Sequence, residues 1–466
     1  MCVEYNLRER PWRMFRILRY VLGSTHTVIR FAAIEDERAV IDVRPHKRYG
    51  LRCPVRGRRC EHYDTSDGPR LWRAMDPARS MRFLRYTTRR ASCPDHGVLV
   101  ESVPWARHKA RCARDFEDWA ACLTANCTVR AVAELARIQW KSVGPICSRV
   151  FADLESRRGA GRFDGLRRIG TDETPYRKGH KYVTVVVDHG RGCLVRAHAG
   201  TGKDVPGLFL DQLTREQRRG IEVVTADGAK WIKTLVKRRC PNARRVMGPF
   251  HVVQWMTEAL GTVRRGEWRG AKKAWGAAKP KKDGPGRPRK GEEAPPEAKA
   301  LKDAADEMKG MRWSLPKNPE DLADAQAAKL ESLKKRAGSR LFGAWELKED
   351  LRAVSGAEAG QEAAALLERR LHDAAYCKIR PVVEAEKKVR RRRADVVAAV
   401  EPGISNGRVE AIDDKVKATV KMGCGFRNTG NLIALTMLRC SDMEPEPPGR
   451  PPKREHREKT RKKKAA

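Results

Sequence analysis

The sequence contains no long uninterrupted hydrophobic run. A helix that spans a bilayer needs about 20 consecutive apolar residues, and no stretch of the 466-residue chain approaches this length. Near Ile17 to Leu22, where a secretion signal would be sought, Arg16 and Arg19 interrupt the apolar pattern. The sequence therefore predicts a cytoplasmic protein with no membrane partner.

Acidic residues are few relative to basic ones. Lysine and arginine number 98, aspartate and glutamate number 59, and the formal net charge is +39. An excess of this size destabilises a compact fold through self-repulsion unless a polyanion binds to it. Nucleic acid is the leading partner, and an anionic membrane surface is the weaker alternative. At about 150 residues per domain, the length suggests two to four domains.

The chain has 13 cysteines, which without a secretion signal are more typical of thiols or metal ligands than of disulfides. Cys53 and Cys60, together with Cys93 and His96, offer the ligands of a tetrahedral Cys3His zinc site. The gap between Cys93 and His96 is the usual two residues, whereas the gap between Cys53 and Cys60 is six. We expect an N-terminal zinc-binding β module over residues 1–110, with incidental thiols as the alternative.

Residues 115–154 carry apolar residues at helical spacing and predict three short helices. Their apolar faces are Phe116, Trp119 and Leu123, then Val129, Val132 and Leu135, then Val143, Ile146 and Val150. With Ser142 as the expected N-cap of the last helix and Pro145 in its first turn, the pattern is typical of a helix-turn-helix over residues 111–160. A plain helical linker is the alternative. The expected DNA contacts are Gln139, Trp140, Lys141, Ser142 and Arg149.

Two acidic residues end short apolar runs in the centre of the chain. Asp172 precedes a turn and a β-branched strand over residues 182–187, and Asp227 follows the apolar run 221–224. Because the carboxyl ends of neighbouring strands face one crevice, we expect the two carboxylates to meet there and to bind Mg²⁺ or Mn²⁺. Glu173 is expected on the opposite strand face, and Asp188 is expected to be a solvent-exposed charge at a strand end.

The expected order of elements indicates a mixed sheet covered by helices. Two N-terminal strands, Thr27–Phe31 and Ala39–Val43, belong to a separate antiparallel sheet. In the central part, three strands joined by hairpins are followed by alternating helices and strands, an order shared by RNase H-like nucleases and integrases. The later expected elements are strands 193–197, 221–225 and 244–247 and helices 204–219, 229–239 and 250–263. Residues 161–265 would form the first part of this domain.

The remaining chain is strongly basic. Residues 264–300 are rich in Lys, Gly, Pro and Glu and predict a solvated linker, in which Arg287 and Arg289 could enter a minor groove or follow phosphates. A basic linker and helical insertion would span residues 266–400. A helix capped by Ser405 or Asn406 carries Glu410 within residues 401–440. If this helix packs beside the two Asp-bearing strands, Glu410 would complete a three-acid site, and the alternative is a surface glutamate. Residues 441–466 predict a disordered basic tail.

With these residues in place, the chain resembles the IS-L-three family of insertion-sequence transposases between about Val21 and Leu438. The resemblance rests on Cys93–Gly97, Asp172–Glu173 with Tyr176–His180, Ala226–Gly228, Phe250–Val253, Lys317–Glu320, and Ser405–Asn406 with Val409–Glu410. The chain departs from the family pattern at Arg56, where a cysteine is usual, and at Gly248, where an aspartate is common.

The resemblance implies a multidomain α+β protein with an RNase H-like catalytic domain and a DDE triad of Asp172, Asp227 and Glu410. It also implies metal-dependent cleavage and strand transfer of double-stranded DNA, at the element's terminal repeats and at target DNA, by a homodimer or larger assembly. Two alternatives remain: a non-catalytic DNA-binding regulator derived from a transposase, and an RNase H-like nuclease that cuts without joining.

Overall fold

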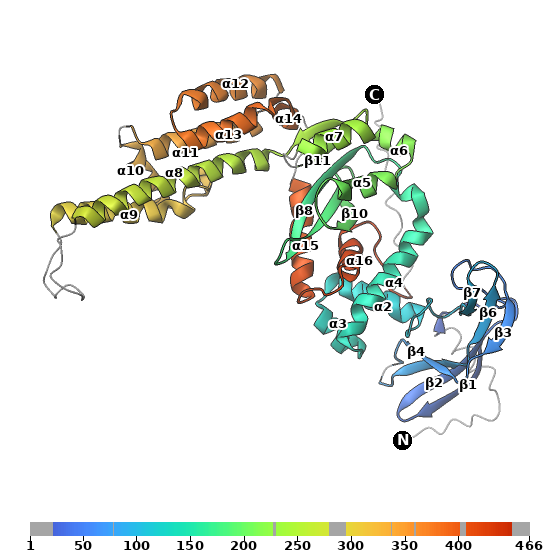
Figure 1. The fold of residues 1–466 in the computed structure, drawn as a ribbon. Helices are drawn as coiled ribbons and strands as arrows, with labels where there is room; N and C mark the ends of the chain where they lie inside the picture. Colours follow the sequence, from blue (N-terminus) through green and yellow to red (C-terminus); the bar gives the residue numbers. More distant parts are fainter. Residues whose placement is uncertain are drawn as a thin grey trace, which may run out of the picture.

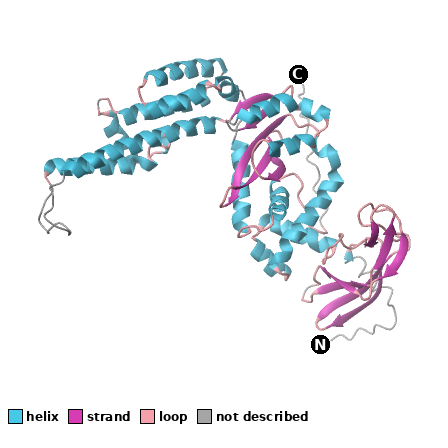
Figure 2. Ribbon diagram, viewed as in Figure 1, coloured by secondary structure: helices cyan, strands magenta, loops and turns pink. Residues whose placement is uncertain are grey.

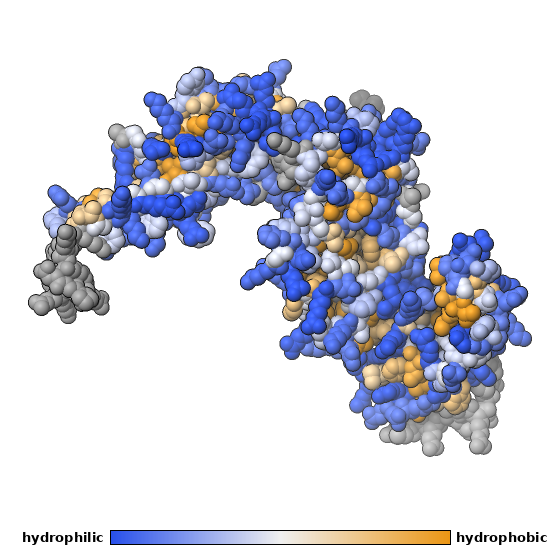
Figure 3. Space-filling view, viewed as in Figure 1, coloured by the Kyte–Doolittle hydropathy of each residue, from blue (hydrophilic) through white to orange (hydrophobic). Residues whose placement is uncertain are grey.

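The computed structural model describes residues 22–77, 79–226, 230–278, 295–336, 338–357, 360–400 and 407–449. Three parts follow one another in space: an N-terminal β module, a central sheet enclosed by helices, and a helical arm that projects from the sheet (Figure 1). The face of the molecule in Figure 3 is mostly hydrophilic, as the charge excess requires. Among the described helices, none has the length and apolar character needed to cross a membrane.

The N-terminal module contains two small sheets. The expected antiparallel pair is confirmed as β1 and β2, and it forms the edge of a sheet of order β1-β2-β5-β4. A second sheet has the order β3-β6-β7. Trp72 and Trp105 pack edge to face in the core, with ring centroids 5.7 Å apart. The strands are β1 (Thr27–Glu35), β2 (Arg38–Pro45), β3 (Glu61–Thr65), β4 (Arg70–Ala74), β5 (Arg82–Tyr86), β6 (Arg89–Cys93) and β7 (Gly97–Val100).

Three helices follow: α2 (Arg114–Asn126), α3 (Val129–Ala136) and α4 (Trp140–Arg158). Thr128 caps α3 by accepting a hydrogen bond from the Ala131 amide, and Arg137 ends it in the left-handed region at φ 52°. The predicted start of the last helix was wrong, because α4 begins at Trp140 with Gln139 as N-cap.

This earlier start changes the roles of three residues. Ser142 lies inside α4 and does not cap it, and Pro145 lies beyond its first turn. The carbonyl four residues before Pro145 therefore loses its helical partner. Leu135, expected on an apolar face, is 62% exposed, whereas Val143, Ile146 and Val150 are buried as expected.

The central sheet has five strands in the order β10-β9-β8-β11-β12. β8, β9 and β10 pair antiparallel, whereas β11 runs parallel to both β8 and β12. The expected mixed sheet is confirmed. Its strands are β8 (Arg168–Arg177), β9 (Lys181–Asp188), β10 (Cys193–Ala199), β11 (Val223–Ala226) and β12 (Arg244–Met247). The predicted helix over residues 204–219 is two helices, α5 (Asp204–Asp211) and α6 (Arg215–Gly220), because Thr214 starts the second with a capping box.

Helices from distant parts of the chain cover the two faces of this sheet. The C-terminal helices α15 (Gly407–Met422) and α16 (Thr429–Cys440) share one core with β9, β10 and the helix-turn-helix. Figure 1 shows α15 and α16, in red, beside the green strands. On the other face, α5 and α7 (Lys230–Arg239) form a second core with Ile169, Val186 and Val224. The helix-turn-helix is thus fixed to the central sheet.

The helical arm has its own apolar core, and its described residues form helices and loops without a strand (Figure 2). Its helices are α8 (Pro249–Ala278), α9 (Pro296–Gly310), α10 (Asp324–Lys334), α11 (Arg340–Ser355), α12 (Gly360–Tyr376), α13 (Arg380–Arg390) and α14 (Arg393–Val397). The prediction of a solvated linker over residues 264–300 was wrong at both ends, because α8 and α9 enter it and pack against each other. Arg287 and Arg289 lie outside the described residues.

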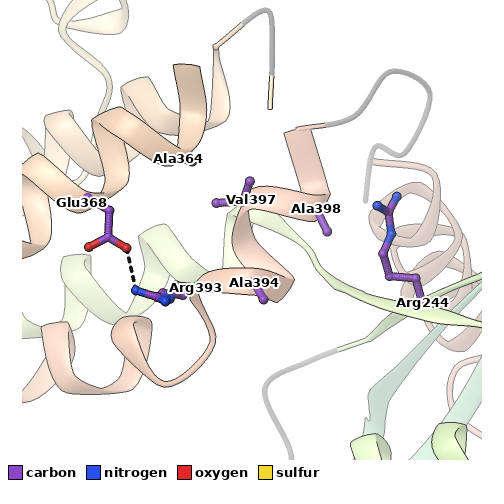
Figure 4. A pocket seen from close by; sticks show the side chains of 7 residues that line it. All are labelled: Arg244, Ala364, Glu368, Arg393, Ala394, Val397 and Ala398. Carbon is purple, nitrogen blue, oxygen red and sulfur yellow. Dashed lines mark hydrogen bonds and ion pairs between the residues drawn. The ribbon is translucent and has the colours of Figure 1, made fainter. Parts of the chain in front are cut away.

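The arm joins the sheet where α14 contacts β12. A cavity of about 470 Å³ lies at this junction, between the sheet strand that carries Arg244 and the helices that carry Glu368 and Arg393 (Figure 4). Arg393 Nη1 donates to Glu368 Oε1 over 2.9 Å across the helices.

The start of the predicted disordered tail is also ordered. Met443 is buried against the central core, and Asp442 Oδ2 forms an ion pair with Arg158 Nη1 at 2.7 Å. The rest of the predicted tail, from residue 450 onward, lies outside the described residues.

Candidate functional site

Asp172 lies in the middle of β8, and not at its carboxyl end as the sequence suggested. The pairing of β8 with β9 continues to Arg177, whereas its parallel pairing with β11 ends at Gly170 opposite Thr225. Asp172 therefore comes just after the end of the β8–β11 ladder. A strand position beyond the end of its neighbour leaves room for a side chain to meet other groups.

The even-numbered residues of β8 face α15. A Cβ on Gly170 would lie 2.5 Å from Cγ2 of Val409, so glycine is needed for α15 to approach this closely. Two positions further along the same face is Asp172, and Thr174 Oγ1 then donates a hydrogen bond to Asp413 Oδ1 of α15. This packing places Asp172 against the helix that also carries Glu410.

Glu173 points to the opposite face of β8. Its carboxylate accepts hydrogen bonds from Thr201 Oγ1 and, over 2.8 Å at Oε1, from the Gly202 amide. The alternation of side chains along a strand accounts for this separation from Asp172. Glu173 therefore orders the loop before α5.

Asp413 is the acidic residue that the sequence interpretation missed. It is 8% exposed and lies against Asp172. Burial, together with the neighbouring Asp172 carboxylate, raises the pKa of Asp413 to about 8. One signal was available: Asp413 lies three residues after Glu410, and side chains three apart share a helix face. Without the contact to β8, nothing separated it from the adjacent Asp414.

The contact between Asp413 and Asp172 should destabilise the protein when no cation is present. In the Asp413→Asn variant the amide can still accept from Thr174, and we expect the free energy of unfolding without added Mg²⁺ or Mn²⁺ to rise by about 2–4 kcal/mol at pH 8. The folded pKa of Asp413 lies above its ordinary value of 3.8, so its stabilisation is complete below about pH 4 and is lost as the pH rises toward 8. Denaturant titrations between pH 4 and 9 should show a gain that grows over this interval.

Two comparisons control this experiment. Asp414→Asn alters an exposed carboxylate that pairs with Lys417 Nζ at 3.1 Å, so it should change stability little. Combining Asp413→Asn with Asp172→Asn should give less than the sum of the two gains, because each change removes the same repulsion. Additive effects would show that the two carboxylates do not interact.

Glu410 is half-buried on α15, one turn before Asp413. In the described part of the chain, neither Glu410, Asp172 nor Asp413 forms an ion pair with a basic side chain. Asp227 lies outside the described residues. Strand β11, which ends at Ala226, is parallel to β8, and in the sequence Asp227 follows Thr225 by two positions, as Asp172 follows Gly170.

The expectation that Asp188 is a solvent-exposed charge was wrong. Its side chain is buried at the end of β9, where Oδ1 accepts from the Gly190 amide at 2.7 Å and Oδ2 pairs with Arg191 Nε at 2.7 Å. A carboxylate that closes a turn in this way is structural.

A second cluster lies in the N-terminal module. Ligand atoms of Cys53, Cys93 and His96 all lie within 4.8 Å of one another. Among the described residues, this is the one cluster of three or more His, Cys, Asp or Glu side chains that is close enough to hold a metal ion. His96 Nδ1 is 3.7 Å from the Cys53 Sγ and 3.5 Å from the Cys93 Sγ. The His96 hydrogen bond lowers the pKa of Cys93 to about 6, which favours the thiolate that binds zinc.

Cys60 lies beside this cluster, across a tight hairpin from Cys53. The Cys60 amide donates to the Leu51 carbonyl over 3.0 Å. Desolvation and the contact with Cys93 raise the pKa of the Cys60 thiol. Arg56, at the position where a cysteine is usual, instead pairs its Nη1 with Asp95 Oδ2 at 2.9 Å. Cys53, Cys93 and His96 are compatible with zinc, whereas Cys60, expected as a further ligand, lies beside this close group and is not part of it.

The expected DNA contacts differ in their accessibility. Gln139, Trp140 and Lys141 are exposed at the start of α4, and Ser142 is half-buried. Arg149 is bound within the protein, because its Nε and Nη2 donate hydrogen bonds to the fully buried Glu117 over 2.9 and 2.5 Å. Of these expected contacts, Gln139, Trp140 and Lys141 are therefore the ones whose side chains are free for a ligand.

Comparisons with known proteins agree with this organisation. Residues 169–436 match a family described as transposase, and residues 101–150 match the helix-turn-helix domain of transposase family ISL3. The second match confirms the predicted helix-turn-helix.

Relatives cover nearly the whole chain. The transposases for insertion sequence element IS1557 from two strains of Mycobacterium tuberculosis are 41% identical over 445 residues, or 94% of this chain and 98% of the relative. The transposase for insertion sequence element IS1001 of Bordetella parapertussis is 23% identical over 259 residues, 55% of this chain and 56% of that protein. This chain therefore belongs to the ISL3 family of insertion-sequence transposases.

Proposed function

We propose that this transposase cleaves DNA at the ends of an insertion sequence and joins the freed ends to target DNA, using Asp172, Asp227 and Glu410 as a metal-binding triad. The observation that carries the proposal is the position of Asp172 on the β8 face that packs against the Glu410 helix. The sheet order, with three antiparallel strands followed by two parallel ones, supports an RNase H-like domain.

The residues present fit a hard divalent cation. Asp172 and Asp413 bring two carboxylates into contact in a largely buried place, without a basic side chain in an ion pair to offset them. Carboxylate oxygens are the ligands that Mg²⁺ and Mn²⁺ prefer. Such ions, held by Asp172, Asp227 and Glu410, would supply activation of a water or 3′-hydroxyl and stabilisation of the leaving oxygen.

The chain itself supplies orientation around this site. The Glu173 amide donates to Asp172 Oδ1 over 2.8 Å, which fixes the carboxylate rotamer. Thr174 holds Asp413 in place from the same strand. These contacts keep the acidic face of β8 pre-organised before DNA arrives.

DNA recognition is assigned to the first turn of α4, where Gln139, Trp140 and Lys141 are exposed. Zinc bound by Cys53, Cys93 and His96, with Cys60 as fourth ligand, would stabilise the N-terminal module. A cytoplasmic location follows from a chromosomal substrate. A homodimer or larger assembly is proposed because transposition requires two element ends to be brought together.

The test is an assay of the full-length protein on DNA that carries the element ends, with Mg²⁺ and a target plasmid. We expect cleavage at the ends and joined products. Cleavage without joining would support the nuclease alternative, and binding without cleavage in Mg²⁺ or Mn²⁺ would support the non-catalytic regulator.

A further inference from the structure

A large groove lies between the helix-turn-helix and the C-terminal helices. Its volume is about 1170 Å³. One wall is the start of α4, the opposite wall is the loop 422–428 between α15 and α16, and the floor includes Tyr176 and Arg177 of β8. Three segments that are far apart in the sequence therefore form one concave surface.

The groove is held open by contacts between its walls. A Cβ on Gly144 would lie 2.6 Å from Asn431 Nδ2, and Ser148 Oγ donates to Asn431 Oδ1 over 2.8 Å, so α4 and α16 are closely packed. The Tyr176 hydroxyl and Thr429 Oγ1 form a hydrogen bond of 3.0 Å. The groove is thus preformed.

Aromatic rings line both walls. Trp140 is 59% exposed at the start of α4. Opposite it, Phe426 is half-buried and folds back over Gly423, where a Cβ would lie 2.5 Å from its ring. The exposed Trp140 ring can stack against the flat face of an unpaired base, and the accessible part of the Phe426 ring, which also packs against the central core, offers a second surface.

Basic side chains surround these rings. Lys141, Arg177 and Arg427 are exposed, and in the described ranges none of them has an ion pair or a side-chain hydrogen bond. The one acidic residue in the lining, Glu134, is paired with Arg130 Nε at 3.0 Å. Unpaired cations beside one exposed and one half-buried aromatic ring complement a strand that carries both phosphates and bases.

The groove also lies on the strand that carries Asp172. Arg177 is five residues along β8 from Asp172, which at about 3.3 Å per residue is about 17 Å. A DNA strand has one phosphate per about 3.4 Å in a duplex, so this separation corresponds to a few nucleotides.

We infer that this groove binds a short unpaired DNA strand, with Trp140 and Phe426 stacking on bases and Lys141, Arg177 and Arg427 contacting phosphates. The inference rests on the proposed function, since it concerns DNA that leaves the Asp172 site. Trp140 and Lys141 are shared with the duplex contacts proposed for α4, whereas Phe426, Arg177 and Arg427 belong to the groove alone.

The experiment measures fluorescence anisotropy of a labelled 15-nucleotide oligo-dT and of a 15-base-pair duplex with full-length, zinc-loaded protein and no added Mg²⁺ or Mn²⁺. Trp140→Ala and Phe426→Leu should each weaken oligo-dT binding about 5- to 100-fold. Phe426→Leu should affect the duplex much less, whereas Trp140→Ala should weaken duplex binding as well, because Trp140 is also assigned to duplex recognition. Lys141→Gln and Arg427→Gln should each lessen the salt slope for oligo-dT by about 0.7.

Trp313→Ala is the matched control, because Trp313 is 68% exposed in the arm, away from the groove. Equal losses for Trp140→Ala and Trp313→Ala, or unchanged oligo-dT binding in Trp140→Ala, would overturn the inference. So would loss of a DNA-free dimer in Trp140→Ala by sedimentation, since the groove would then hold a second copy of this chain.

Single-strand binding is read without cleavage, which keeps the two proposals separate. If wild-type protein fails to cleave element ends but Trp140→Ala still loses oligo-dT affinity, the groove inference stands and the proposed chemistry fails. If cleavage is normal and oligo-dT binds no better to wild type than to Trp140→Ala, the chemistry stands and the groove inference fails.

Discussion

Asp172→Asn is expected to abolish DNA cleavage while leaving the binding of element-end DNA intact. The amide keeps the size of the side chain and can still accept the hydrogen bond from the Glu173 amide, but it removes the charge that attracts a divalent cation. Loss of metal assistance costs several kcal/mol of barrier, which is on the order of 10³-fold or more in rate. Cleavage assays and gel-shift titrations on the same protein measure the two effects separately.

Asp227→Asn and Glu410→Gln should behave in the same way. Calcium should support binding of end DNA but little cleavage, because Mg²⁺ requires near-octahedral coordination and Ca²⁺ does not. Full activity in Glu410→Gln would mean that the third ligand lies elsewhere, and Asp413, which touches Asp172, would be the next residue to test.

Glu173→Gln is the matched control for the strand. Its carboxylate binds Thr201 and Gly202 on the opposite face of β8, and the amide can still accept these bonds. We expect normal cleavage. Loss of cleavage in Glu173→Gln, with normal cleavage in Asp172→Asn, would reverse the assignment of the two faces.

Removal of zinc is expected to unfold the N-terminal module. Structural zinc contributes about 10–16 kcal/mol of binding free energy in small zinc domains, and the sheet β3-β6-β7 ends at the cluster of Cys53, Cys93 and His96. Metal analysis of the full-length protein should find about one zinc per chain. Chelation should make residues 22–110 sensitive to protease and leave the helical arm resistant.

Cysteine variants distinguish the fourth ligand. Cys53→Ser and Cys93→Ser should lose zinc, and Cys60→Ser should lose affinity if Cys60 completes the site. Cys122→Ser, in the helix-turn-helix, should keep full zinc content. Zinc-free protein with an intact N-terminal module would contradict the metal assignment. The Arg56–Asp95 ion pair would then be the contact to test as a structural replacement for the metal.

Much of the fold could be predicted from local patterns. The strands β1, β2, β9, β10 and β12 have strong alternating or β-branched runs, and the turn residues between them mark their limits. The predicted ends of helices were less accurate, because Ser142 resembles an N-cap although tertiary packing starts α4 at Trp140. Local capping preference contributes about 1 kcal/mol, which packing along a whole helix can outweigh.

The site residues depended on contacts that composition does not reveal. Arg149 seemed available to DNA, but its partner Glu117 is 32 residues away in the sequence. Likewise, Asp413 meets Thr174 across 239 residues, so only the packing of α15 on β8 brings it to Asp172. The ordered ends of the predicted linker had the same cause, since α8 and α9 pack against each other within a basic sequence.

The most direct test of metal-dependent catalysis at Asp172 is a change of metal preference in Asp172→Cys. A thiolate is a softer ligand than a carboxylate and binds Mg²⁺ poorly, whereas Mn²⁺ accepts it more readily. We expect cleavage of element-end DNA by this variant to be lost in Mg²⁺ and partly restored in Mn²⁺, with wild type active in both. Full cleavage by Asp172→Cys in both metals would contradict a role for Asp172 as a metal ligand.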